Sequence, residues 1–277
     1  MAWTQARGAA GLFCILLAGA CSGPPKPSAD QPTNQSVAAD IKPVVAPLAP
    51  SASAAKAFKL EDRTPALDFA YAYPMQAAAI PALASTLAER MDKTKADALK
   101  AAKDDEASAK QAGYPFRQHS LQTTWAIHAD TPRFLGLLGE TYVYSGGAHG
   151  MTAYAPLLWD RQAAKEVPIT ALMMSQAAFA KAISARFCDA LDEERAKKRG
   201  APVTRDAGEF SKCVDPMKQA IVPEAGKDGV VSLIRVVIGP YEAGPYAEGS
   251  YDIAVPVDEG VLGAIKPEYR GSFAGGR

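Results

Sequence analysis

The first 57 residues limit how much of this chain is available to fold. An apolar run from Ala9 to Ala20 follows the lone basic residue Arg7, and it is too short to span a bilayer of about 30 Å as a helix. The run leads into Leu16-Leu17-Ala18-Gly19-Ala20-Cys21, which has the layout of a bacterial lipobox. The sequence therefore predicts a signal peptide over residues 1–20 and lipidation, palmitate included, at Cys21. Cleavage that leaves Cys21 free is the alternative, because Ala18 stands where a lipobox usually has Leu.

Residues 21–57 have a composition that cannot build a core. Pro, Ser, Ala, Gln and Asn dominate and aromatic residues are nearly missing, so this segment is predicted to be a disordered tether behind the lipid anchor. Ser22 follows the cysteine, and a residue other than Asp at this place is typical of lipoproteins sent to the outer membrane. We expect a lipid-anchored protein on the periplasmic face of the outer membrane, with a soluble periplasmic protein as the alternative.

Residues 58–277 are enough for one large domain or two small ones. The whole chain has 30 acidic and 30 basic residues and a formal net charge of zero. Nucleic-acid binders usually carry a basic stripe, and none is present. The sequence therefore predicts no nucleic-acid partner, and membrane contact only through the lipid.

Two cysteines, Cys188 and Cys213, remain beyond the anchor. Export to an oxidising compartment predicts a disulfide between them, which would stabilise the fold by roughly 3 kcal/mol in the chain-entropy model. Two buried free thiols or a redox pair are the alternatives. No Cys-x-x-Cys spacing supports the redox reading.

Hydrophobic periodicity predicts alternating strands and helices. Strands are expected at Leu67–Tyr73, Phe116–Ala129, Arg133–Tyr144, Met151–Trp159, Val231–Ile238 and Tyr251–Val255. A long helix is expected from Pro81 to Gly113, a second one capped by Thr170 and ending at Gly200, and a short one over Asp258–Ile265.

The candidate functional residues lie in two glycine-rich segments. The first, Tyr142 to Gly150, contains Tyr144 and His149; the second, Gly239 to Gly249, contains Tyr241, Glu242, Tyr246 and Glu248. Rigid aromatic surface with nearby carboxylates is suited to stacking on a sugar or engaging a basic protein. The alternative is that these tyrosines only pack on the sheets.

Catalysis is the weaker hypothesis. His149 is the one histidine to test as a base, yet no nucleophile motif accompanies it, and a turn residue bonded to nearby backbone is the simpler interpretation. On a regular strand His119 and His128 point to opposite faces, which argues against a shared metal. No catalytic residue, metal ligand or cofactor is predicted.

Several segments of the second half resemble the C-terminal domain of the RsiV anti-sigma ectodomain, a domain that also accompanies the peptidoglycan deacetylase PdaC. These segments are Tyr144–Gly150, the helix expected after Thr170, Pro240–Glu242, Pro245–Gly249 and Ile253–Pro256. The preceding strand, long helix and strands resemble the smaller domain that normally comes before it. The resemblance assigns residues 58–140 to a PdaC-like N-terminal domain and residues 141–277 to an RsiV-like C-terminal domain.

This resemblance implies an α+β fold, with two packed subdomains of antiparallel sheets and flanking helices. It also implies a role at the cell envelope, and RsiV-like ectodomains bind lysozyme. The sigma-binding part and the deacetylase metal motifs have no counterpart here. The expected function is thus a non-catalytic envelope lipoprotein that binds a periplasmic protein, lysozyme included, or a peptidoglycan fragment. A cell-wall glycan hydrolase or deacetylase-like enzyme using His149 is the alternative.

Overall fold

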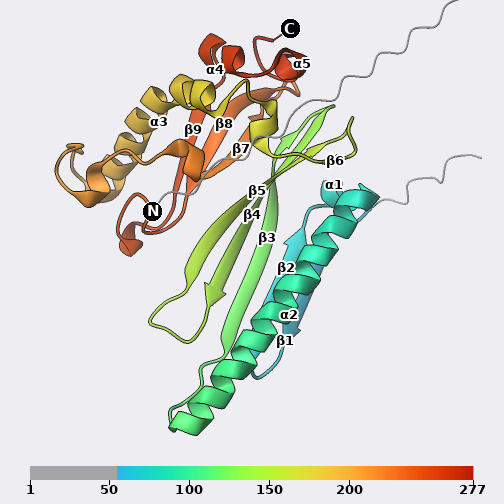
Figure 1. Ribbon diagram of the computed structural model, residues 1–277, viewed down its shortest axis with the longest axis vertical. Coiled ribbons are helices and arrows are strands. Elements are labelled where there is room, and N and C mark those ends of the chain that lie inside the picture. The colour runs from blue at the N-terminus through green and yellow to red at the C-terminus, as the bar shows by residue number, and fades with distance from the viewer. Residues whose placement is uncertain (1–54, 277) are drawn as a thin grey trace, which may run out of the picture. The chain divides into compact units, whose positions relative to one another are not determined.

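The computed structural model describes residues 55–276 (Figure 1). The predicted signal peptide over residues 1–20, the lipidated Cys21 and the tether up to residue 54 lie outside the described residues. Three residues of coil, 55–57, precede the first strand.

A six-stranded sheet runs in the order β1-β2-β3-β4-β5-β6. Its strands are β1 (Phe58–Arg63), β2 (Leu67–Tyr73), β3 (His119–Asp130), β4 (Phe134–Tyr144), β5 (Met151–Asp160) and β6 (Lys165–Glu166). All neighbours are antiparallel except β2 and β3, which are parallel. A parallel pair needs a long crossover, and the helices between these two strands supply it. The predicted antiparallel pairing thus holds for every neighbouring pair of this sheet except β2 and β3.

The crossover consists of α1 (Met75–Ala78) and the long α2 (Pro81–Ala112), which passes in front of β1 and β2 in Figure 1. The first half of α2 buries large apolar side chains at helical spacing, Leu83, Leu87 and Met91. They join a core with the aromatic residues of β2 and with Trp125 of β3, whose Nε1 donates to Tyr71 Oη at 2.8 Å. Burial of each large apolar side chain contributes about 1.5–3 kcal/mol, which holds α2 on the sheet.

A second, antiparallel sheet has the order β7-β8-β9. Its strands are β7 (Ala220–Ala225), β8 (Val231–Ile238) and β9 (Tyr251–Pro256), and it packs with α3 (Gln176–Arg199), α4 (Glu259–Ala264) and α5 (Pro267–Arg270). Short 3-10 turns complete the chain: η1 (Ile169–Leu172), η2 (Glu209–Ser211), η3 (Pro216–Lys218) and η4 (Tyr246–Glu248). The fold class is mixed α+β, as predicted.

The two sheets share a core. Phe134 of β4 and Leu158 of β5 are buried in the same cluster as Phe179 and Phe187 of α3 and Ile234 of β8. The predicted domain boundary after residue 140 falls inside β4. Strands β4 and β5 therefore contribute side chains to both halves of the described chain.

The long periodic elements agree with the sequence patterns. The predicted strands and the helices ending at Gly113 and Gly200 are confirmed, and both glycines have the left-handed backbone of a helix C-cap. The prediction that Thr170 caps this helix was wrong. α3 begins at Gln176 and its N-cap is Ser175, whose Oγ accepts from the backbone N–H of Ala178. Thr170 instead lies in η1.

The disulfide between Cys188 of α3 and Cys213 is confirmed, with 5.5 Å between the Cα atoms. Disulfides persist in oxidising compartments, so this bond is consistent with a protein outside the cytoplasm. Among residues 55–276, no helix combines the length and the apolar character needed to cross a bilayer.

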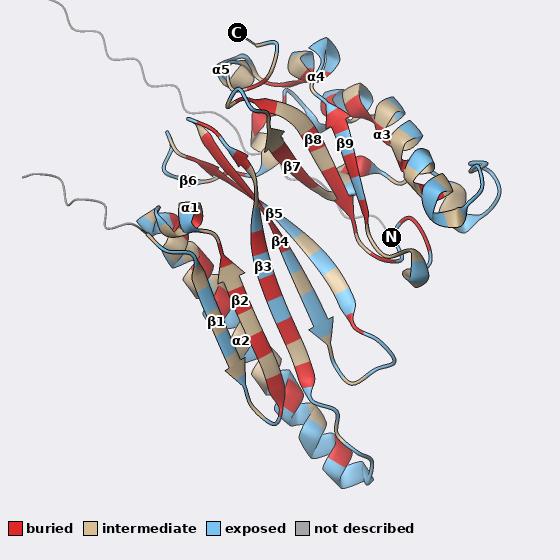
Figure 2. Ribbon diagram, turned by 180° about the vertical axis from the view of Figure 1, so that it is seen from behind, coloured by how far each residue is buried: buried red, intermediate tan, exposed pale blue. Residues whose placement is uncertain are grey.

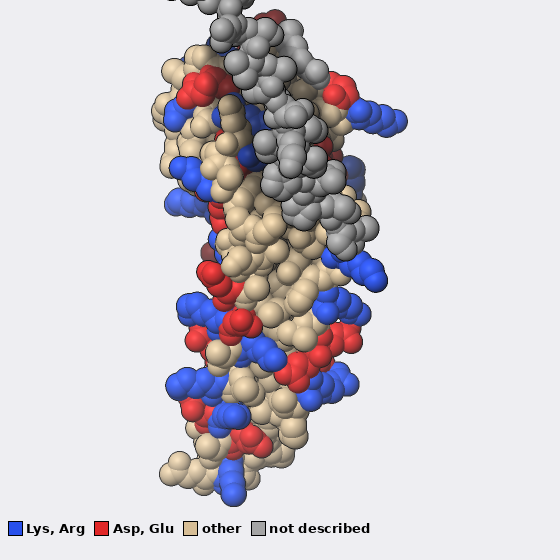
Figure 3. Space-filling model, turned by 90° about the vertical axis from the view of Figure 1, so that its right-hand side faces the viewer, with Lys and Arg blue, Asp and Glu red and all other residues tan. Residues whose placement is uncertain are grey.

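Charges of both signs are mixed over the face shown in Figure 3, where Lys and Arg lie next to Asp and Glu. On α2 this includes the exposed i,i+4 pairs Lys93–Asp97 and Lys100–Asp104. Such pairs are worth a few tenths of a kcal/mol each, so they keep α2 helical and solvated rather than form a recognition stripe.

Candidate functional site

The β4–β5 turn and the β8–β9 loop meet at one end of the fold. Within the turn, Gly146 has a φ of +85°, and Gly150 packs its backbone directly on the Tyr142 ring. A Cβ at position 150 would lie 2.3 Å from this ring, so only glycine allows the contact. The glycine-rich string thus fixes where the Tyr142 ring lies.

Three rings from the two segments form a cluster across this junction. His149 stacks on Tyr246 with 3.8 Å between ring centroids and 22° between planes, and the Tyr246 hydroxyl donates to Gly150 O at 2.9 Å. The Tyr241 ring lies 5.6 Å from that of Tyr246, and its hydroxyl lies 3.4 Å from His149 Nε2. Together with Tyr142 these residues are called the aromatic platform below.

Tyr142, His149 and Tyr241 of the aromatic platform are exposed although aromatic side chains favour burial, and Tyr246 is half-buried. Tyr241 is 48% exposed and Tyr142 is 38% exposed, and Figure 2 shows the ends of β4 and β5 next to the turn as exposed strand. No Asp, Glu, Lys or Arg occurs from Thr141 to Trp159. Exposed apolar surface without charge is typical of interaction sites.

Tyr241 has an unusual backbone, with a φ of +70°. The left-handed region costs a residue with a Cβ about 1–2 kcal/mol, and such conformations cluster at functional sites. The conformation persists only where neighbouring contacts hold the loop in place.

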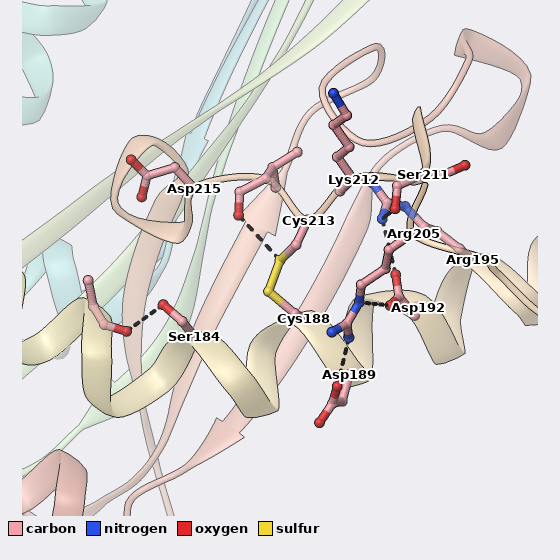
Figure 4. The surroundings of a disulfide bond; sticks show 12 residues. Ser184, Cys188, Asp189, Asp192, Arg195, Arg205, Ser211, Lys212, Cys213 and Asp215 are labelled. Atoms are coloured by element: carbon pink, nitrogen blue, oxygen red, sulfur yellow. Dashed lines mark hydrogen bonds and ion pairs between the residues drawn. A yellow bond between two sulfur atoms is a disulfide. The ribbon is translucent and has the colours of Figure 1, made fainter. Parts of the chain in front are cut away.

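Two arginines of α3 supply those contacts. The fully buried Arg195 donates from Nε to Ala243 O at 2.9 Å, and its Nη atoms donate to Ser211 O and Lys212 O at 3.3 and 2.9 Å. Figure 4 shows Arg195, Ser211 and Lys212 beside the disulfide. The guanidinium therefore links the β8–β9 loop to the segment that contains Cys213.

Arg199, one helical turn further, forms a two-pronged ion pair with Glu248 at 2.8 and 2.9 Å. Its hydrogen bonds lower the pKa of Glu248, so this carboxylate stays charged well into the acidic range. The Tyr251 hydroxyl also donates to Glu248. Burial, followed by this hydrogen bond, raises the pKa of Tyr251 to about 12. Glu248 is thus engaged in holding the loop.

Carboxylates flank the aromatic platform. Glu242 is exposed next to Tyr241, and Glu140 lies two residues before Tyr142 on the same face of β4. A cleft of about 250 Å³ runs between the sheets, lined by Glu140, Tyr154, Asp252 and neighbouring residues. Carboxylates therefore flank the rings, while the cations Lys198 and Arg117 donate to Glu248 O and Gly147 O of the same two segments.

The structure brings together three of the six predicted ligand-binding residues, His149, Tyr241 and Tyr246. Glu242 lies beside them. Tyr144 lies apart, with its hydroxyl donating to Gly147 O at 3.1 Å, and Glu248 is paired with Arg199. Tyr142 was considered with the other tyrosines as part of a ligand platform but was not selected as a candidate, although its place before a Gly-rich turn was the available signal. The sequence does not indicate that Arg195 is buried, because it is one of many charged residues in the last turns of α3.

No carboxylate within residues 55–276 orients His149 through a hydrogen bond. Its Nδ1 lies 3.0 Å from Gly150 O, and its Nε2 faces the Tyr241 hydroxyl. His119 bonds to Asp105 of α2, whereas His128 lies 3.6 Å from Glu224 of β7, so the two histidines point to different layers. Within the described residues 55–276, no group of three or more His, Cys, Asp or Glu is arranged to hold a metal ion.

Residues 60–152 match the family model described as Deacetylase PdaC. The PdaC-like resemblance of the N-terminal part is thereby confirmed, while the RsiV-like resemblance of the remainder stays a prediction. No curated protein matches the chain.

Two solved structures are similar to this chain. A DUF3298 family protein from Pseudomonas aeruginosa PAO1 is 13% identical, with a TM-score of 0.48, covering 77% of this chain and 95% of its own. A DUF3298 family member from Bacteroides fragilis NCTC 9343 is 14% identical, with a TM-score of 0.44, covering 80% of this chain and 98% of its own.

Proposed function

We propose that this chain is a non-catalytic lipoprotein of the cell envelope, anchored through Cys21 at the periplasmic face of the outer membrane, and that its aromatic platform binds a basic protein partner. The observation that carries this proposal is the cluster that His149 and Tyr142 of the uncharged segment Thr141–Trp159 form with Tyr241 and Tyr246 of the β8–β9 loop, in which all but Tyr246 are exposed. Aromatic residues are enriched and charges depleted at the centres of protein interfaces.

The acidic flank supports a basic partner. Glu140 and Glu242 form no ion pair among the described residues, so their charges are free to face a cationic surface. Complementary charge at the rim of an interface speeds association and selects the partner more than it adds affinity. Lysozyme is a basic protein and is the probe that the RsiV-like resemblance suggests.

The proposal that the protein is non-catalytic is supported by the surroundings of His149. A catalytic base is normally oriented by a third group, and a nucleophile lies within hydrogen-bond reach of it. The partners of His149 are a backbone carbonyl and a tyrosine hydroxyl. This environment is that of a ring held in place for stacking.

A peptidoglycan fragment is the second candidate ligand. The exposed ring of Tyr241, held by a strained backbone next to the His149–Tyr246 stack, offers a flat apolar face of the kind that sugars stack on.

Titration of the full-length chain with lysozyme tests the proposal. We expect saturable binding that weakens as salt rises from about 50 to about 200 mM, because the flanking charges are exposed and screened. An acidic protein of similar size is the control and should not bind. Purified muropeptides incubated with the chain should keep their masses. Absence of lysozyme binding at every salt concentration, or loss of muropeptide mass, would contradict the proposal.

A further inference from the structure

The opposite face of the same hairpin borders a second hollow, between α2 and the ends of β3 and β4. The side chains that α2 turns toward the sheet become small in its second half, where Ala102 and Ala109 are buried in place of Leu and Met. An apolar slot of about 220 Å³ remains there, lined chiefly by carbon atoms of Leu67, Ala98, Ala101, Leu121 and Val143. Val143, which lines this slot, is 37% exposed because no neighbouring side chain of the described residues fills the slot.

A polar basin of about 550 Å³ adjoins this slot, and Ser145 lines both. His119 and Asp105 form a polar pair in the wall between slot and basin, with 3.1 Å between His119 Nε2 and Asp105 Oδ2. His119 is only 8% exposed, so this pair is held in place. Tyr114, 50% exposed, lines the basin on the side of the α2 C-terminus.

Arg117 is the cation of the basin, which the Asp105 carboxylate bonded to His119 also lines. Its Nη1 donates to Gly147 O at 3.2 Å and to the Tyr144 hydroxyl at 3.5 Å, and no carboxylate among residues 55–276 pairs with it. A guanidinium is always charged and has five donors in a planar fork that fits a carboxylate. Arg117 therefore has both charge and donors left for a ligand.

We propose that the slot and basin form a second binding site, which takes a small molecule with a free carboxylate next to a small apolar side chain, such as the C-terminal end of a short peptide. The carboxylate binds Arg117 in the basin and the apolar side chain enters the slot beside Val143. An acidic side chain is excluded, since the exposed surface of the slot is almost entirely apolar and Asp97 is among the residues that line it.

NMR titration of the full-length chain with acetyl-alanyl-alanine tests this site. We expect shifts at Val143 and Gly147 and binding at least tenfold tighter than for the same peptide with an amidated C-terminus. Arg117→Gln should reduce the affinity about tenfold. Lys103→Gln, which removes an exposed cation from α2, should leave it unchanged.

Val143→Ser tests the slot separately, because an exposed position tolerates the change without unfolding. We expect Val143→Ser to weaken the binding of acetyl-alanyl-alanine but not the binding of acetate alone. Equal binding of the amidated peptide, equal binding of inorganic phosphate, or an Arg117→Gln variant with unchanged affinity would overturn the proposal. A Tyr241→Gly variant should bind the peptide normally, which separates this site from the aromatic platform.

Discussion

Replacing Arg195 with Met is expected to lower the free energy of unfolding by about 3 kcal/mol. The substitution keeps most of the apolar stem but removes the hydrogen bonds from a fully buried guanidinium to the carbonyls of Ala243, Ser211 and Lys212. It also removes the ion pair of Arg195 with Asp192. Removing the charged partner of a buried polar group lowers the free energy of unfolding far more than removing the partner of an exposed one. Urea unfolding at neutral pH measures the loss.

Arg205 offers a matched control for Arg195. It pairs with Asp189 and Asp192 of α3, the second of which also pairs with Arg195, and its side chain is 46% exposed. Arg205→Met should therefore lose less than about 1 kcal/mol. Arg195→Lys should be nearly as harmful as Arg195→Met, because an ammonium cannot reach three carbonyls in the fork geometry. A loss for Arg195→Met as small as that for Arg205→Met would contradict the role assigned to Arg195.

Removal of the disulfide is expected to lower the free energy of unfolding by about 3 kcal/mol. The bond closes a loop with a sequence separation of 25 residues, and opening it restores the freedom of that loop in the unfolded chain. The double variant Cys188→Ser/Cys213→Ser leaves no lone thiol in this loop to form a wrong pair. Urea unfolding of the oxidised chain, the reduced chain and the double variant measures the effect, and the last two should agree.

The disulfide and Arg195 should not act independently. Lys212, whose carbonyl oxygen accepts from Arg195, is the residue before Cys213 (Figure 4). Removing the disulfide frees the segment around Cys213 and therefore weakens its hydrogen bond to Arg195. In a double-mutant cycle the combined loss should be smaller than the sum of the two single losses by at least about 0.5 kcal/mol. Strict additivity, or a double cysteine variant as stable as the parent, would show that the segment is held by other contacts.

Local sequence patterns predicted the long elements well because each of them follows one period. The stripe of Leu83, Leu87 and Met91 and the alternation along β3 each fix a buried face. β1, β6 and β7 were missed. Four of the six residues of Phe58–Arg63 are charged, Lys165–Glu166 has only two residues, and Ala220–Ala225 contains a proline. Edge strands commonly have such sequences, which resemble loops.

The aromatic platform could be predicted only in part. The glycine-rich strings marked both segments, since Gly146 and Gly150 are needed for the turn. The contact between His149 and Tyr246, however, joins segments 97 positions apart, and no local period encodes such a pairing. The predicted ligand role of Glu248 rested on its place beside Tyr246, and sequence alone did not reveal that Arg199 engages it.

Lysozyme binding by the Tyr241→Gly variant tests the central claim, that the aromatic platform is the binding surface, most directly. Glycine adopts a φ of +70° without strain, so the variant removes the ring and should change the free energy of unfolding by less than about 1 kcal/mol. Tyr114→Ser removes an equally exposed ring outside the platform and is the control. We predict at least tenfold weaker binding for Tyr241→Gly and unchanged binding for Tyr114→Ser. Equal affinities of both folded variants and the parent chain would contradict the account.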